Sequence, residues 1–231
     1  TSGVIYGVVD KPKYDPQSRI NPFAHVNHTF ENPRLGLLLC INGAGIQYAW
    51  LKNQMAESGT SFSEMGALAS QIPVGSEGLR IIPFGNGAER ILENKNPGAQ
   101  INNLNFNRHT RAHFYRAGLE GIAFSFYYGF KILNKVGLNP RVIKVGNDNL
   151  FQSEIFSQTI ANLLNCDIEV VKTTGAVGAA KASGIGAGVY RNLEEAMTKN
   201  EVENIFKPNL NSEAYQKAYK VWEGDLNKLI H

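Results

Sequence analysis

Between residues 141 and 190 the sequence alternates between strand-like and helix-like segments, and this alternation constrains the fold more than any other feature. Two short apolar runs, Arg141–Val145 and Asp167–Val171, predict strands. Each is followed by a segment of helical periodicity, Ser153–Leu164 and Ala176–Tyr190. This order makes neighbouring strands parallel and covers them with helices. The sequence therefore predicts an α/β fold.

The upstream part of the chain adds further strands and a long helix to this unit. The apolar and β-branched runs Val4–Val9, Arg34–Ile41 and Leu79–Phe84 predict strands, and the last two are typical of strands buried on both faces. Thr110 is a suitable N-cap for a long helix that Gly137 ends. No shift in composition marks a domain boundary, so we treat the chain as one α/β unit.

Shorter helices are indicated by apolar spacing and by capping residues. Apolar residues recur at helical spacing over residues 46–59, and Ser61 with Glu64 has the spacing of a capping box. Residues 85–104 are rich in Gly and Asn, and we expect a long functional or lid-like loop there. A single apolar stripe from about Ser212 predicts a terminal helix.

Two groups of glycines lie inside predicted helices. Gly118, Gly121 and Gly129 fall within the helix that follows Thr110. Because each interior Gly costs about 1 kcal/mol relative to Ala, their presence suggests that another backbone passes close by. Residues 184–188 resemble a dinucleotide fingerprint, but that motif must follow a strand and open a helix. Close helix packing explains this second group better.

Composition excludes several classes of function. The 231 residues carry a net charge of +3 with both signs mixed along the chain, which gives no basis for nucleic-acid binding. No apolar run approaches the length of a membrane span. Cys40 and Cys166 lie in apolar runs typical of reduced, buried thiols, and a single disulfide between them is the alternative. We expect a soluble, cytoplasmic protein. Since Thr1 stands directly in a strand-like run, we also expect a piece of a longer chain.

Glycine-bearing turns next to the predicted strands and helices are the strongest candidates for a binding site. Glycine there lets a ligand approach the backbone, and a helix start offers unpaired N–H groups to an anion. In open α/β sheets such turns gather outside the carboxyl ends of the strands. One such turn alone more often only redirects the chain, but several together favour a phosphate-containing ligand. The turns are Thr1-Ser2-Gly3, Asn42-Gly43-Ala44-Gly45, Gly146-Asn147-Asp148-Asn149 and Thr174-Gly175.

The sequence offers little for other chemistries. It lacks the Gly-x-x-x-x-Gly-Lys-Ser/Thr pattern of a P-loop and the Gly-x-Ser-x-Gly elbow of a serine nucleophile. His109 and His113 have the i, i+4 spacing of two metal ligands, but no third ligand of matching spacing follows. A helix-capping or surface pair is the better interpretation, and we expect no metal site in this chain.

Several landmarks together resemble the C-terminal half of the FGGY carbohydrate kinases, most closely the xylulokinases of that family. Residues 1–3 are similar to the end of the family's Gly-Thr-Ser-Gly hairpin, and Gly87-Ala88-Glu89-Arg90 to its Gly-x-Glu-Arg landmark. The most specific stretch runs from Leu104 to Glu120, where the spacing of His113, Ala117 and Glu120 resembles the second family signature. Residues 145–153 occupy the position of the adenosine motif.

The resemblance implies an actin-like, ribonuclease-H-like ATPase domain over residues 1–231, with a mixed sheet flanked by helices. It implies ATP and Mg²⁺, with adenosine between the turns at Gly43 and Gly146. Where the family has glycines, we expect the side-chain amides of Asn147 and Asn149 to replace some backbone contacts. The nucleotide-binding residues implied are Thr1, Ser2, Gly3, Gly43, Gly45, Gln47, Gly146, Asn147 and Asn149.

The resemblance also implies a reaction, the transfer of the ATP γ-phosphoryl group to a sugar hydroxyl. The acceptor we expect first is D-xylulose, which gives D-xylulose 5-phosphate. Another FGGY kinase, for glycerol, ribulose, fuculose or gluconate, is one alternative, and a non-catalytic ATP-binding module of the same fold is another. The family's catalytic Asp lies upstream of the hairpin. This chain would therefore need the N-terminal half of the same enzyme, would be inactive alone, and would expose an interdomain face that favours self-association, for example as a homodimer.

Overall fold

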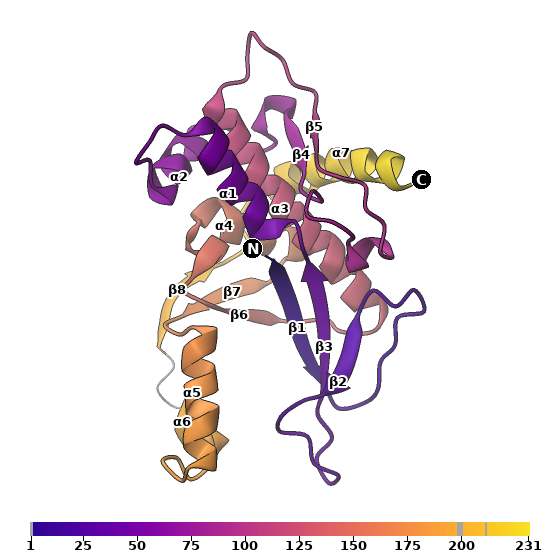
Figure 1. The fold of residues 1–231 in the computed structure, drawn as a ribbon, viewed down its shortest axis with the longest axis vertical. Helices are drawn as coiled ribbons and strands as arrows, with labels where there is room; N and C mark the ends of the chain where they lie inside the picture. The colour runs from indigo at the N-terminus through magenta and orange to yellow at the C-terminus, as the bar shows by residue number, and fades with distance from the viewer. Residues whose placement is uncertain (1, 198–200, 211) are drawn as a thin grey trace.

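The computed structural model describes residues 2–197, 201–210 and 212–231. Within these residues the strands form three small sheets, and helices pack on and between them (Figure 1). The strands are β1 (Gly3–Val9), β2 (Asn21–Ala24), β3 (Leu35–Ile41), β4 (Arg80–Ile82), β5 (Gln100–Asn102), β6 (Val142–Gly146), β7 (Asp167–Val171) and β8 (Val202–Phe206). The α-helices are α1 (Ala44–Met55), α2 (Phe62–Ser70), α3 (Arg111–Lys135), α4 (Glu154–Leu164), α5 (Gly175–Gly186), α6 (Leu193–Met197) and α7 (Ser212–Ile230). Short 3₁₀ turns are η1 (Ser76–Gly78), η2 (Arg90–Leu92) and η3 (Asn149–Gln152).

The strand order confirms the predicted α/β organisation. In the sheet β6–β7–β8, β6 and β7 run parallel and α4 connects them, as the strand–helix alternation predicts. β8 pairs antiparallel with β7 and makes this sheet mixed. The sheet β1–β3–β2 is antiparallel, with Gly3 opposite Ile41, so the start of β1 lies beside the end of β3. β4 and β5 form a separate antiparallel pair.

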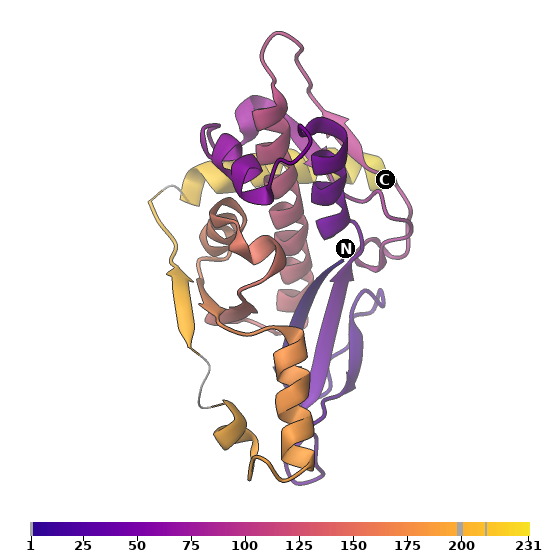
Figure 2. The same cartoon turned by 60° about the vertical axis from the view of Figure 1, so that its left-hand side comes forward.

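Helix α3 runs through the middle of the molecule (Figures 1 and 2). Eighteen of its 25 residues are buried, all round the helix, because α1, α2, α4, α7 and strand β4 pack against it. A helix buried on every side is typical of the centre of a domain. Phe124 and Phe126 show this: Phe124 meets Trp222 of α7 edge-on, and Phe126 meets Phe156 of α4 in the same way. The hydrophobic core is therefore organised around α3.

The glycines of α3 have different neighbours. At Gly121 an added Cβ would lie 2.2 Å from the carbonyl oxygen of Ile81, so this glycine does admit a neighbouring backbone, as predicted. At Gly118 and Gly129 the nearest atoms belong to side chains, among them Leu51 and Leu39, so the predicted close backbone is wrong there.

Two helix starts confirm their predicted caps. Ser61 and Glu64 form a capping box at α2. At α3, Nδ1 of His113 accepts a hydrogen bond of 3.1 Å from the backbone N–H of Thr110. His113 therefore serves the helix start, whereas the neighbouring His109, whose ring lies 5.2 Å away, accepts a hydrogen bond from the N–H of Asn105. Cys40 and Cys166 are both free thiols, the first half-buried and the second buried.

Two sequence expectations about glycine-rich segments are wrong. Helix α5 ends at Gly186 rather than Tyr190, and an added Cβ would meet nothing within 4 Å at Gly186 or Gly188, so close helix packing does not explain residues 184–188. Only Gly184 packs closely, against the ring of Tyr190. Residues 85–104 are not an unpacked loop, because they contain η2, whose Ile91 is buried, and strand β5. No helix of the described residues combines the length and apolar character that crossing a membrane requires.

A buried ion pair fixes the excursion between β1 and β2. Arg19 donates to both carboxylate oxygens of Asp15, at 2.8 and 2.7 Å, and the two side chains are 8% and 3% exposed. The guanidinium of Arg19 lowers the pKa of the Asp15 carboxyl. Because the carboxyl has a lower pKa in the folded than in the unfolded chain, its stabilising effect is present above the unfolded value and is lost as the pH falls.

We predict a pH-dependent difference between the natural chain and Asp15→Asn. The free energy of unfolding should be lower for Asp15→Asn at neutral pH, and the gap should shrink as the pH falls below about 4, the ordinary value for Asp. Urea denaturation at a series of pH values measures this, with the exposed Asp10→Asn as the control. A gap that stays constant down to about pH 2.5 would contradict it.

We also predict that Gly121→Ala destabilises the fold by about 1–3 kcal/mol, because the new methyl group overlaps the Ile81 carbonyl and the packed core cannot yield. Gly224→Ala in α7 is the matched control, since nothing lies within 4 Å of its added Cβ. That change should be neutral or stabilise by up to about 1 kcal/mol. Thermal unfolding of both variants tests the pair, and equal melting temperatures would be inconsistent with it.

Candidate functional site

A groove of about 820 Å³ lies between β1 and β6, and it is larger than a second cavity of about 290 Å³ between α3 and α7. Its walls include residues 2–8 of the first strand and 142–146 of the sixth, with Phe126 and Phe130 of α3 behind them. The segment 148–151, which contains η3, lines it as well. The groove thus combines apolar walls with exposed backbone turns, a composition typical of small-molecule sites.

The structure brings five of the predicted site residues to this one groove. These are Ser2, Gly3, Gly45, Gly146 and Asn149, which come from three separate turns. Their meeting follows from the fold: β1 starts beside the end of β3, where α1 begins, and β6 flanks the groove on its other side. Gly43, Gln47 and Asn147 do not line the groove, and Thr1 lies outside the described residues.

Gly43 is engaged within the protein. Its N–H donates to Oε1 of Glu89 at 2.8 Å, and an added Cβ would lie 1.9 Å from the carbonyl oxygen of Pro83. Close approach of the Pro83 backbone therefore requires glycine at this position. Its amide is occupied by the carboxylate in this structure.

In contrast to the amide of Gly43, the side-chain amide of Gln47 is not engaged by any of the described residues. Its side chain stands on the first turn of α1 and only 8% of the residue is exposed, yet neither its amide nitrogen nor its amide oxygen has a hydrogen-bond partner in the described residues. Buried polar atoms without partners are uncommon and costly in native proteins. The side chain lies against α3, where its nitrogen is 3.0 Å from the position of a Cβ on Gly118. A bound ligand or water would satisfy this amide.

In the turn after β6, Gly146 and Asn149 line the groove, whereas the side chain of Asn147 contacts strand β8. Gly146 approaches the carbonyl oxygen of Thr173, where an added Cβ would be 2.6 Å away. The side-chain amide of Asn147 donates to Glu203 of β8, and its backbone N–H donates to Val171. Asn149 adopts a left-handed conformation, with φ of 51°, at the start of η3 and lines the groove.

Sequence reasoning missed two parts of the site. The first is the aromatic wall, where Phe126, Phe151 and Phe156 meet edge-on with ring centroids 5.1–6.4 Å apart. Its only sequence signal is the apolar stripe of the two helices. The second is Glu89, a fully buried carboxylate at the turn before α1. Burial raises the pKa of the Glu89 carboxyl, while the two backbone N–H donors act in the opposite direction.

The fold and the groove define a class of protein, the actin-like ATPase domains. A solved structure of a ligand-bound xylulose kinase from Lactobacillus acidophilus superposes with a TM-score of 0.82 and 25% identity, covering 99% of this chain and 46% of that chain. A gluconate kinase from the same organism gives a TM-score of 0.82 with 23% identity, covering all of this chain and 46% of that one. The predicted actin-like fold, with its mixed sheet flanked by helices, is confirmed.

Within that class, the chain belongs to the FGGY family of carbohydrate kinases, whose C-terminal domain matches residues 1–187. Among curated relatives, the xylulose kinase of Haemophilus influenzae is 28% identical over 99% of this chain and 45% of its own length. The chain thus spans about half the length of the curated relatives it matches. The family resemblance seen in the sequence is confirmed.

Proposed function

We propose that this chain is the nucleotide-binding half of an ATP-dependent carbohydrate kinase that phosphorylates D-xylulose to D-xylulose 5-phosphate. The observation that carries the proposal is the meeting of three glycine-bearing turns at one groove, in a chain of the FGGY family. D-Xylulose is preferred because several of the similar proteins are named xylulose kinases. Because a gluconate kinase has a similar fold, the substrate of another FGGY kinase is the alternative.

The residues present fit ATP by their chemistry. The backbone N–H of Gly45 suits a phosphate oxygen, because first-turn amides of a helix lack intrahelical partners, and Ser2 and Gly3 line the same groove. The apolar wall suits the adenine ring. Gln47 does not line the groove, but its side-chain amide, which has no partner in the described residues, stands on the same turn of α1 as Gly45 and offers a donor and an acceptor. Gly146 and Asn149 would bound the adenosine side, and we propose Thr1, which lies outside the described residues, as a further phosphate contact.

Mg²⁺ fits this chain less well. The described residues contain no group of three or more His, Cys, Asp or Glu that could hold a metal ion. Mg²⁺ usually reaches such sites through nucleotide phosphates and water. We therefore assign no Mg²⁺ ligand to this chain and no step to the ion here.

The partner we propose is the N-terminal half of the same enzyme. This chain matches only 45% of the length of a curated relative, and the remainder of that relative is long enough to hold such a half. Two surfaces of this chain suit such a neighbour. β1 leaves Val4 50% and Tyr6 43% exposed, and α5 has no buried residue. Helices α5 and α6 project from the body toward the same end of the molecule as the β2–β3 loop (Figures 1 and 2).

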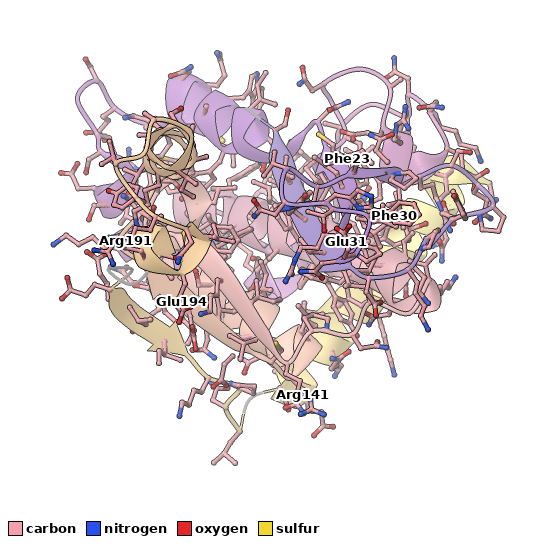
Figure 3. The ribbon with its side chains drawn as sticks, turned by 90° about the horizontal axis from the view of Figure 1, so that it is seen from below. Phe23, Phe30, Glu31, Arg141, Arg191 and Glu194 are labelled. Atoms are coloured by element: carbon pink, nitrogen blue, oxygen red, sulfur yellow. The ribbon has the colours of Figure 1, made fainter. Side chains whose placement is uncertain are left out.

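The view from below shows side chains of both projecting parts (Figure 3). Phe23 and Phe30 lie on the side of the β2–β3 hairpin, and Arg191 and Glu194 lie on the side of α6. Phe30 is 97% exposed. We propose that contact with the N-terminal half, or with a second copy of the chain, covers apolar surface here.

Phosphoryl transfer depends mainly on positioning and charge stabilisation, and this chain would supply the nucleotide side only. We predict that the purified 231-residue chain shows no sugar-dependent ATP consumption, while the full-length protein phosphorylates D-xylulose. A coupled assay with ATP and a panel of ketoses, polyols and gluconate measures both. Turnover by the 231-residue chain would contradict the proposal that this chain supplies only the nucleotide side. A preference for another sugar would replace D-xylulose as the proposed substrate.

We further predict that Gln47→Met weakens ATP binding by the full-length protein about tenfold, the loss expected for one to two hydrogen bonds. Stability without ATP should be unchanged or higher, because the change removes an unpaired buried amide and roughly conserves volume. Gln54→Met, at an exposed position of the same helix, is the control. Calorimetric titration and thermal unfolding give the two readouts. Unchanged ATP affinity in Gln47→Met would remove Gln47 from the site.

A further inference from the structure

Glu89 joins two segments that lie far apart in the sequence. Its carboxylate is fully buried, and its two oxygens accept hydrogen bonds from the backbone N–H groups of Asn42, at 2.9 Å, and Gly43, at 2.8 Å. Both donors belong to the turn that leads from β3 into α1. A negative charge in this place is favoured by the positive end of the helix dipole and by two charge-assisted hydrogen bonds.

Three more contacts connect the same turn to residues 83–89. The side-chain amide of Asn86 donates to the carbonyl of Asn42 at 3.0 Å, and the side-chain amide of Asn42 donates to the carbonyl of Ala88 at 2.8 Å. The backbone of Pro83 presses on Gly43, where no Cβ could fit. We call this set of contacts between residues 83–89 and the turn at 42–43 the turn clamp.

The turn clamp sets where α1 can bind a ligand. Because Glu89 occupies the amides at 42 and 43, a phosphate would have to use amides further along the first turn, which the helix leaves without intrahelical partners. Gly45 lines the groove, and the unpaired Gln47 follows on the same turn. The directions of both depend on the angle at which α1 leaves β3, and the turn clamp fixes that angle.

We propose that Glu89 is a positioning residue for the nucleotide: its buried carboxylate sets the first turn of α1 so that Gly45 faces the groove. Glu89 itself does not touch the nucleotide. This role rests on the proposed function, because it concerns the same site, and it gives the Gly-x-Glu-Arg segment a task in ATP binding.

The test uses Glu89→Gln in the full-length protein. The amide that replaces the carboxylate keeps the shape but turns an N–H₂ donor toward a backbone N–H, so one of the two bonds is lost and the turn shifts. We expect the KM for ATP to rise about tenfold, with the KM for the sugar changed less than about twofold. Glu93→Gln, an exposed glutamate in the same segment, is the matched control and should match the natural enzyme.

A second variant tests the turn clamp from the surface. Asn86→Ala removes the bond to Asn42 at an exposed position and should raise the KM for ATP about threefold, with Asn96→Ala as its control. If Glu89→Gln does not fold, the KM for ATP of Asn86→Ala decides whether the turn clamp positions the nucleotide. A purely structural Glu89 would lower the melting temperature and the active fraction while leaving the KM for ATP unchanged, and that result would overturn the proposal. A natural enzyme that does not use ATP would instead overturn the proposed function itself.

Discussion

Burial of α3 on every side is the constraint on which the rest of the structure depends. The helix supplies the floor of the groove through Phe126 and the packing surface for α1, α4 and α7. Because the backbone of a neighbouring strand can approach a helix closely only where the helix carries a small residue, Gly121 fixes the approach of β4. The positions of the turns at the groove are therefore consequences of core packing as much as of the turns themselves.

Two buried carboxylates organise the irregular backbone around this core in the same way. Glu89 binds the turn before α1, and Glu120 of α3 accepts hydrogen bonds from Gly75 and from the hydroxyl of Ser76 while it pairs with Arg116 at 2.7 Å. The segment 75–78 needs such an anchor, because all four residues have positive φ. Burial raises the pKa of both carboxyl groups, so their partners compensate a real desolvation cost.

Local signals explain which elements could be predicted from the sequence. Periodicity predicted α4, Thr110 as a cap predicted the start of α3, and the apolar run Asp167–Val171 predicted the limits of β7. β8 is short and exposed along most of its length, and its pairing with β7 is what makes it a strand. Glycine turns predicted five residues that meet at the groove, but the engagement of Gly43 by Glu89 arises across 46 residues and leaves no local pattern.

Helix α5 shows where packing within this chain is insufficient. Its 12 residues include four glycines, and none of them is buried by the described residues. Isolated helices of this length are marginal in water even when rich in alanine, and interior glycine weakens them further. Helix α6 packs against α5, but this contact buries none of the α5 residues, so α5 has exposed surface left for a further neighbour. Contact with the proposed N-terminal half would cover that surface and would join the helix beyond β7 to the wall of the nucleotide groove.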